Sequence, residues 1–324
     1  MKLAVLGTGK IVQEFLPMIQ QVSDVELVAL LSTPRSLDKA KEMQSHYQIQ
    51  EVYIDYDTLL ANDMIDTVYV ALPNHLHYQY TKAALLQGKN VICEKPFTLN
   101  AQQLQELIQI ATEKQLILLE AITNQYLNNF LQIKKDLAKL GKIKIVECNY
   151  SQYSSRYDAF KEGKILPAFD PQKGGGALMD INIYNIHFVV GLFGKPEKVQ
   201  YLANIERNID TSGILVLDYG DFKAVCIGAK DSTANIRSVI QGTDGSIEVL
   251  GATNEMPRYE RRSKTEAESV NVNLDKHRMY QEFEKFTEVI AQKNWDFAAE
   301  KLNHSLTVMQ VVDQAIASAN LHLG

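Results

Sequence analysis

The chain has 324 residues, of which 46% are hydrophobic and 22% are charged, and its formal net charge is -6. This length accommodates about two domains, and the negative charge gives no electrostatic reason to expect a nucleic acid or an anionic membrane as a partner. The first apolar run, residues 3–6, is too short for a signal peptide or a membrane span, so we expect a cytoplasmic protein.

The first 120 residues alternate short apolar runs with helical patterns. Strands are predicted at residues 3–6, 26–31, 67–72, 90–93 and 116–119, and helices at 10–21, 37–47, 75–87 and 100–114. Pro17 lies inside the first of these helices and is expected to kink or loosen it. The alternation predicts a doubly wound parallel sheet with helices on both faces, which is an α/β Rossmann domain over residues 1–120.

The pattern changes beyond residue 120. Strands are predicted at residues 143–153, 198–206, 211–219, 222–230, 234–242 and 245–250, and helices at 177–192, 276–292 and 299–319. Consecutive strands joined by tight turns predict an antiparallel sheet. We therefore expect an α+β domain with an open, mainly antiparallel sheet over residues 121–324.

The beginning of the chain reads as a strand, a glycine turn and a helix start. Gly7 permits the turn, Gly9 lets the backbone approach a pyrophosphate, and the helix start offers free N–H groups. Val12 replaces the third glycine of the usual fingerprint, so a plain turn is the competing interpretation. The position on the first strand favours a dinucleotide. The expected cofactor contacts are Gly7, Thr8, Gly9, Lys10 and Ile11.

The end of the second predicted strand bears on the choice between NAD and NADP. An acidic residue there binds the ribose 2′-OH of NAD, whereas an arginine accepts the 2′-phosphate of NADP. The chain has no acid at this point and places Ser32, Thr33 and Arg35 there instead. A solvated loop arginine is the alternative interpretation. We expect NADP in preference to NAD.

Two further motifs follow the third and fourth predicted strands. Open α/β sheets bind ligands at the carboxyl ends of their strands, and a lysine before a proline is held in an extended conformation. Considered alone, Lys95 reads as an ordinary surface lysine. The cofactor contacts expected from these motifs are Leu72, Pro73, Asn74, His77, Glu94 and Lys95.

A helix behind the glycine run at residues 174–176 carries a polar stripe. Asp180, Tyr184 and His187 are spaced i, i+4 and i+7, which predicts that they share one helix face. A polar stripe on an apolar helix favours a functional face. The alternatives are a helix-start acid for Asp180 and an ordinary core histidine for His187.

Together these motifs, in this order and at this spacing, resemble the Gfo/Idh/MocA family of oxidoreductases. The resemblance covers essentially the whole chain and implies that Lys95 and Tyr184 face the substrate and the nicotinamide. Tyr184 is similar to the glucose–fructose oxidoreductase and dihydrodiol dehydrogenase branch, because the inositol dehydrogenase branch has a histidine there. Asn182 replaces a frequent glycine, and Gln125 stands near a frequent arginine, which puts the usual substrate contacts in doubt.

The resemblance implies reversible hydride transfer between a nicotinamide and a hydroxyl-bearing carbon of a sugar, polyol or related cyclic alcohol. Such a reaction needs a proton acceptor. Either Tyr184, its pKa lowered by the Lys95 ammonium, or Lys95 itself fills that role, and Asp180 orients the pair or holds a substrate hydroxyl. We expect Lys95 and Tyr184, from different domains, to meet beside the nicotinamide. The candidate substrate contacts are Asn124, Arg156 and His187.

Two other functions leave some of these residues unexplained. A non-catalytic dinucleotide sensor on the same fold has no chemical need for both Lys95 and Tyr184. A Rossmann enzyme of another class does not account for the glycine run followed by Asp180.

Three dispersed cysteines without a Cys-x-x-Cys pair predict neither a disulfide nor a metal site. An open sheet with one uncovered face predicts a homodimer or a dimer of dimers.

Overall fold

The computed structural model describes residues 1–322 and divides into two compact units. Unit 1 comprises Met1–Ala121 and Met279–Ser305, and unit 2 comprises Ile122–Arg278 and the chain from Leu306 onward. The sequence pattern predicts that all of residues 121–324 belong to the second domain. The segment Met279–Ser305 belongs to unit 1 because Phe283 completes an aromatic core there.

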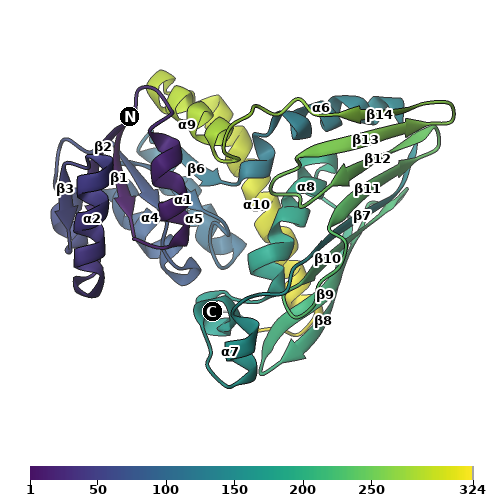
Figure 1. The fold of residues 1–324 in the computed structure, drawn as a ribbon, viewed down its shortest axis with the longest axis horizontal. Coiled ribbons are helices and arrows are strands. Elements are labelled where there is room, and N and C mark those ends of the chain that lie inside the picture. Colours follow the sequence, from purple (N-terminus) through teal and green to yellow (C-terminus); the bar gives the residue numbers. More distant parts are fainter. Residues whose placement is uncertain (323–324) are drawn as a thin grey trace. The chain divides into compact units, whose positions relative to one another are not determined.

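Unit 1 is built on a six-stranded parallel sheet with the order β3-β2-β1-β4-β5-β6 (Figure 1). Its strands are β1 (Lys2–Leu6), β2 (Glu26–Leu31), β3 (Glu51–Tyr53), β4 (Thr67–Val70), β5 (Asn90–Glu94) and β6 (Leu118–Ala121). The strand order reverses between β1 and β4. The carboxyl ends of these two strands therefore flank the point at which open α/β sheets bind ligands.

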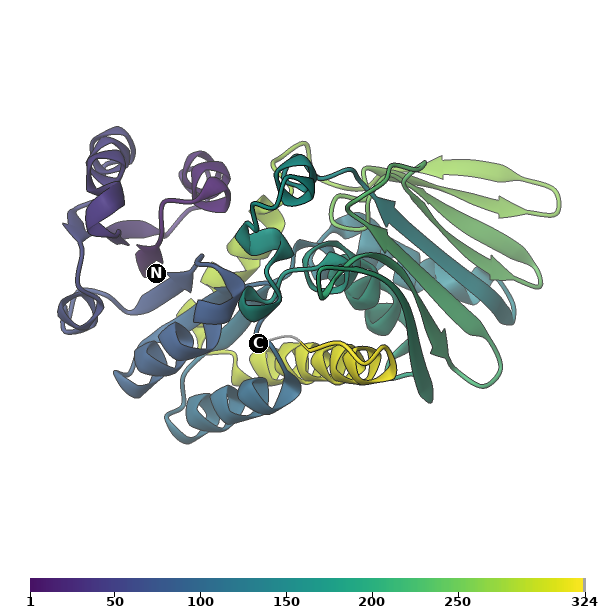
Figure 2. The same ribbon diagram turned by 90° about the horizontal axis from the view of Figure 1, so that it is seen from below.

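Helices cover both faces of this sheet, with α1 and α2 on one side and α4 and α5 on the other (Figure 2). The helices are α1 (Lys10–Ile19), α2 (Leu37–Tyr47), α3 (Tyr56–Leu60), α4 (His77–Leu86), α5 (Ala101–Glu113) and α9 (Tyr280–Gln292). Phe15 of α1 packs on Tyr69 of β4 and Phe283 of α9, with ring centroids 4.6 and 4.7 Å away. This aromatic core lies directly behind the glycine turn. Helix α1 includes Pro17 and ends two residues after it.

Unit 2 contains an eight-stranded sheet with the order β14-β13-β12-β11-β7-β10-β9-β8. Its strands are β7 (Ile143–Ser151), β8 (Lys198–Glu206), β9 (Ile209–Asp218), β10 (Lys223–Ala229), β11 (Arg237–Gly242), β12 (Gly245–Leu250), β13 (Arg258–Ser263) and β14 (Ala267–Val270). All neighbouring pairs are antiparallel except β7 and β10, which are parallel. The expected open, mainly antiparallel sheet is confirmed.

The helices of unit 2 gather on one face of this sheet, and the other face is uncovered (Figures 1 and 2). They are α6 (Asn128–Asp136), α7 (Tyr157–Lys161), a π-helical segment (Leu178–Asn182), α8 (Ile183–Phe193) and the end of α10 (Trp295–Ser318). The segment Pro171–Phe193 is long and apolar enough to cross a membrane by composition, but 72% of its most apolar stretch is buried. It forms a core helix of the unit.

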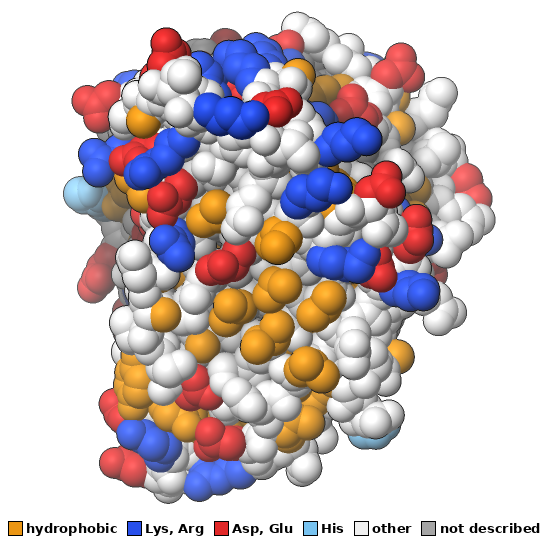
Figure 3. Space-filling model, turned by 90° about the vertical axis from the view of Figure 1, so that its right-hand side faces the viewer, with side chains coloured by type: hydrophobic (Ala, Val, Ile, Leu, Met, Phe, Trp, Pro, Cys, Tyr) orange, Lys and Arg blue, Asp and Glu red, His pale blue; other side chains and the backbone are white. Residues whose placement is uncertain are grey.

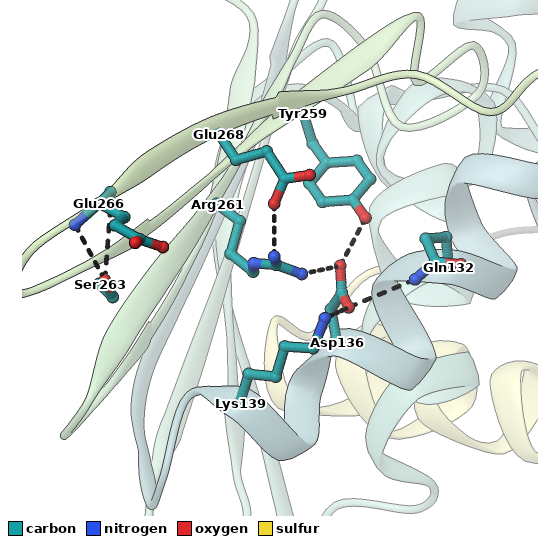
Figure 4. Close-up of polar contacts among 8 residues, drawn as sticks. All are labelled: Gln132, Asp136, Lys139, Tyr259, Arg261, Ser263, Glu266 and Glu268. Atoms are coloured by element: carbon teal, nitrogen blue, oxygen red, sulfur yellow. Dashed lines mark hydrogen bonds and ion pairs between the residues drawn. The ribbon is translucent and has the colours of Figure 1, made fainter.

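Asp136, at the end of α6, anchors that helix to the far strands of the sheet (Figure 4). Its buried carboxylate accepts the Tyr259 hydroxyl at 2.7 Å and pairs with Arg261 at 2.9 Å and Lys139 at 2.8 Å. Burial raises the pKa of Asp136, but hydrogen bonds from Lys139 and Tyr259 outweigh it, so the pKa lies below its usual value. A carboxylate satisfied in this way fixes structure and leaves no site for a ligand.

Candidate active site

The glycine turn of unit 1 has the geometry that a bound dinucleotide requires. Gly7 has a φ of +103°, and a Cβ atom there would lie 2.9 Å from the Ala71 carbonyl oxygen. Gly9 caps α1 without a side-chain hydrogen bond, and a Cβ atom there would meet no other atom within 4 Å. No side chain caps the start of α1, and the first N–H groups of a helix have no partner within the helix, which suits a pyrophosphate. Val12, in place of the third glycine, is fully buried.

The loop after β2 carries the cation Arg35. Strand β2 pairs with β1, so this loop follows the strand next to the one that carries the glycine turn. Gly7 donates its N–H to the Leu31 carbonyl at 2.9 Å, which joins the two strand ends. Arg35 lies on the single turn Pro34–Ser36, is exposed and makes no ion pair with any residue of the range 1–322. An arginine without a protein partner is able to receive a phosphate with its full set of donors.

His77 ties together the two loops that carry the remaining cofactor motifs. Its fully buried ring contacts the Leu72 carbonyl through Nε2 at 2.7 Å and the Pro96 carbonyl through Nδ1 at 2.8 Å. Burial lowers the pKa of His77, and the two carbonyl contacts oppose that effect. Both ring nitrogens are engaged by the protein, so we infer that His77 positions the loops at Leu72 and Pro96.

Lys95 is half-buried, and two buried carboxylates, Glu94 and Glu120, fix the chain on either side of it. The preceding residue, Glu94, accepts the Tyr69 hydroxyl at 2.6 Å. Glu120 of β6 accepts the Phe97 N–H at 3.2 Å, two residues after the lysine. The backbone on either side of Lys95 is therefore fixed by β4 and by β6. These contacts hold residues 94–97 in a defined position at the carboxyl end of β5.

The glycine run of unit 2 makes room for a buried carboxylate. Gly176 has a φ of +102°, and a Cβ atom there would lie 2.0 Å from Asp210 Oδ1. The other oxygen, Asp210 Oδ2, accepts the Leu178 N–H at 2.6 Å and the Tyr201 hydroxyl at 2.8 Å. Asp210 thus caps the π-helical segment, and only glycine fits where the chain enters it.

Asp180 and Tyr184 alone are not buried among residues 174–190. Asp180 and Tyr184 are thus both partly exposed, whereas His187 is fully buried, so the three residues do not form the predicted common face. Since Leu178–Asn182 is π-helical, one extra residue enters the turn, and the α-helical spacing from Asp180 to His187 no longer returns to the same face.

The polar residues just before α6 support the backbone of α8. Buried Asn124 donates its side-chain N–H to the Tyr184 carbonyl at 2.9 Å, and Gln125 donates to the His187 carbonyl at 2.9 Å. Gln125 also occupies the space that a side chain at Gly191 would need. We infer that Asn124 positions Tyr184 through its backbone. Arg156 lies elsewhere, exposed at the start of α7.

Comparisons with known proteins agree with this geometry. An oxidoreductase family with an NAD-binding Rossmann fold, GFO_IDH_MocA, matches residues 1–122, and the GFO/IDH/MocA C-terminal domain matches residues 130–248. The chain is 34% identical to scyllo-inositol 2-dehydrogenase (NADP(+)) IolU of Bacillus subtilis, over 97% of this chain and 95% of that protein. The chain belongs to the Gfo/Idh/MocA family.

More distant relatives show the same fold. Trans-1,2-dihydrobenzene-1,2-diol dehydrogenase of Xenopus tropicalis is 29% identical over 76% of this chain and 74% of its own length. The structure of KijD10, a 3-ketoreductase from Actinomadura kijaniata in complex with TDP-benzene and NADP, superposes with a TM-score of 0.82 at 22% identity, covering 98% of this chain and 97% of that chain. The expected family, fold class and NAD(P)-dependent oxidoreductase activity are confirmed.

Asp210, which the sequence did not single out, gives this Gfo/Idh/MocA chain a pH-dependent stability. Burial raises the pKa of Asp210 from 3.8 to about 6. A carboxyl with a raised folded-state pKa contributes stability that is fully present below its unfolded pKa and lost as the pH rises through about 6. Asp210→Asn removes this loss. The unfolding free energy of the variant, relative to that of wild type, should therefore rise by roughly 2 kcal/mol when the pH is raised from about 4 to about 8.

Urea unfolding at the two pH values measures this gain, and Asp231→Asn is the matched control. Burial also raises the pKa of Asp231, but hydroxyls of Thr211 and Ser212, each 2.7 Å away, outweigh it and leave the pKa below its usual value. Removing Asp231 should therefore cost more stability at the higher pH. The same pH dependence for wild type and Asp210→Asn contradicts the assigned pKa.

Proposed function

We propose that this chain oxidises a ring CH–OH of a cyclic polyol, of the inositol type, with NADP as the cofactor, and that it catalyses the reverse reduction. The observation that carries the proposal is that Asp180 and Tyr184 alone are partly exposed within the otherwise buried stretch of residues 174–190. The likeness to IolU, whose name includes both scyllo-inositol and NADP(+), supports the substrate class and the cofactor. A cytoplasmic location is part of the proposal.

The residues of unit 1 would hold the cofactor. Gly7, Gly9 and the α1 N-terminus would bind the pyrophosphate, and Arg35 with Ser32 would bind the adenosine 2′-phosphate. Within residues 1–322, the absence of neighbours around a side chain at Gly9 and the lack of an ion-pair partner for Arg35 support this assignment. When bound, NADP+ accepts the hydride from the carbinol carbon.

The protein supplies proton transfer and orientation. Tyr184 would take the proton from the substrate hydroxyl, leaving a ketone, and the Lys95 ammonium would favour the phenolate form of Tyr184. Asp180 would hold a neighbouring hydroxyl of the substrate. A polyol ring offers several such hydroxyls, and a carboxylate is a strong acceptor for them.

A fluorescence titration with NADPH and NADH, followed by an initial-rate screen, tests the proposal. The screen uses scyllo-inositol, myo-inositol, cyclohexanol and glucose with NADP+. We expect tighter binding of NADPH and reduction of NADP+ by an inositol. Tight NADPH binding without turnover of any alcohol supports the alternative, a dinucleotide-binding sensor. Absence of binding contradicts both.

We also propose that two copies pair through the uncovered face of the unit 2 sheet. Figure 3 shows hydrophobic side chains gathered on this side of the molecule, with charges of both signs around them. Leu202 and Ile214 are paired across β8 and β9, are 55% and 42% exposed, and continue to Ile227 on β10. Apolar patches of this kind mark interfaces, and a twofold axis lets one patch cover its own copy.

Ile214→Glu is expected to convert the dimer into a monomer, because a carboxylate would be buried at the centre of the interface. Light scattering should then fall from about twice 36.5 kDa to about 36.5 kDa. Ile54→Glu is the matched control, since Ile54 is 55% exposed but lies in unit 1. A monomeric wild type at micromolar concentration refutes this interface.

A further inference from the structure

Lys230 places a buried ammonium group behind Asp180. It directly follows β10, and its side chain is only 3% exposed. Its Nζ atom lies 2.7 Å from Asp180 Oδ2, whereas the Asp180 side chain is 38% exposed. One member of the ion pair is therefore in the core, and the other reaches the surface of the proposed site.

The surroundings of Lys230 fix its position. Its backbone N–H donates to the Thr211 carbonyl at 2.8 Å. Nζ also donates to the Ala168 carbonyl at 2.5 Å and lies 4.4 Å from the centre of the Phe169 ring. Strand β9 thus holds the backbone of Lys230, and the turn at residues 167–169 holds its ammonium group, so the group that contacts Asp180 has a fixed position.

An ion pair with one buried member needs an explanation other than stability. Taking the Lys230 ammonium out of water costs about as much as its attraction to Asp180 returns, so the pair contributes little net stability. An ammonium with a fixed position does, however, hold the facing carboxylate in one orientation. The contact with Lys230 therefore orients Asp180. Tyr184, four residues further along the chain, is the other partly exposed residue of this stretch.

We infer that Lys230 is a positioning residue for the reaction and acts through Asp180. This inference rests on the proposed function, in which Asp180 holds a substrate hydroxyl. Lys230 touches neither substrate nor cofactor. Without its charge, Asp180 loses the contact that orients it, and the substrate is held less well in its reactive position.

A double-mutant cycle on kcat/KM separates this role from a purely structural one. Lys230→Met should lower kcat/KM of the wild type at least about tenfold. In an Asp180→Asn background the same change should cost less than about threefold, because the carboxylate it acts through is already gone. Lys223→Met is the matched control, since Lys223, the first residue of β10, pairs with Asp218 at 2.7 Å in an exposed position. Full activity of Lys230→Met, or independent effects of the two changes, overturns the inference.

Lys230→Gln guards against a folding defect of the methionine variant. Glutamine keeps an N–H donor for the Ala168 carbonyl but removes the charge that faces Asp180. We expect Lys230→Gln to bind NADPH and unfold like wild type, yet to lose kcat/KM as Lys230→Met does. Full activity of Lys230→Gln shows that the lysine serves only the turn at Ala168. Full activity of Asp180→Asn, or no turnover by wild type, instead counts against the proposed function and the inference together.

Discussion

Tyr184→Phe is expected to lower kcat by about 10²- to 10⁴-fold and to leave NADPH binding unchanged. The substitution keeps the ring and removes only the hydroxyl that would carry the proton. Tyr184 is one of the two partly exposed residues of the stretch 174–190, and Asn124 fixes its backbone. Steady-state kinetics with an inositol and fluorescence titration with NADPH measure the two quantities separately.

Lys95→Ala should reduce kcat at least as far, because the ammonium favours the deprotonated tyrosine. Tyr219→Phe is the control for loss of a tyrosine hydroxyl. Its hydroxyl donates to the Gly194 carbonyl at 2.8 Å, beyond the end of α8, so its loss should leave kcat within about threefold. If Tyr184→Phe retained full activity on a substrate of the wild type, Tyr184 would not be the proton carrier.

Arg35→Ala is expected to weaken NADPH binding by roughly 1.5–3 kcal/mol, or about 10- to 150-fold, with little effect on NADH. The reason is that a charge-assisted contact to the 2′-phosphate exists only with NADPH. Fluorescence titration with both nucleotides measures the ratio. Equal losses for the two nucleotides, or no loss, contradict the phosphate role.

Lys114→Ala is the control for loss of an exposed cation from unit 1. Lys114 follows α5 at the amino edge of the parallel sheet, opposite the carboxyl ends that carry the glycine turn. Its removal changes the net charge as Arg35→Ala does, so a small shared effect on NADPH reports only long-range electrostatics. The specific part of the Arg35 effect is the difference between the two variants.

The elements that the sequence predicted best are those with strong apolar patterns. The buried strand β1 and the alternating strand β9 follow their patterns within two residues. Strand β3 is short and partly exposed, and β13 reads Arg-Tyr-Glu-Arg-Arg-Ser, so neither carries an apolar signal. The parallel pairing of β7 with β10 depends on contacts between distant segments, which local patterns do not encode.

The site was predictable where its chemistry follows from a local motif. The glycine turn, Lys95 and the pair Asp180 and Tyr184 come from short stretches of sequence. Lys230 and Asp210 lie 50 and 30 residues from Asp180, after β10 and in β9, where no motif marks them, so only the fold brings them to the helix. Asn182, where a glycine is frequent, is accommodated because Gly228 faces it on β10. No signal within residues 178–182 alone reveals that compensation.

Transfer of deuterium tests the central claim, NADP-dependent oxidation of a ring CH–OH, most directly. The wild-type enzyme is incubated with NADP+ and an inositol that carries deuterium on its ring carbons, and the nicotinamide product is analysed by mass spectrometry and NMR. The proposed reaction predicts one deuterium at C4 of the reduced nicotinamide and an equal amount of cyclic ketone, and predicts neither product with Tyr184→Phe above a trace. Reduced nucleotide without deuterium, or no reduction although NADP+ binds, would contradict hydride transfer from the polyol ring.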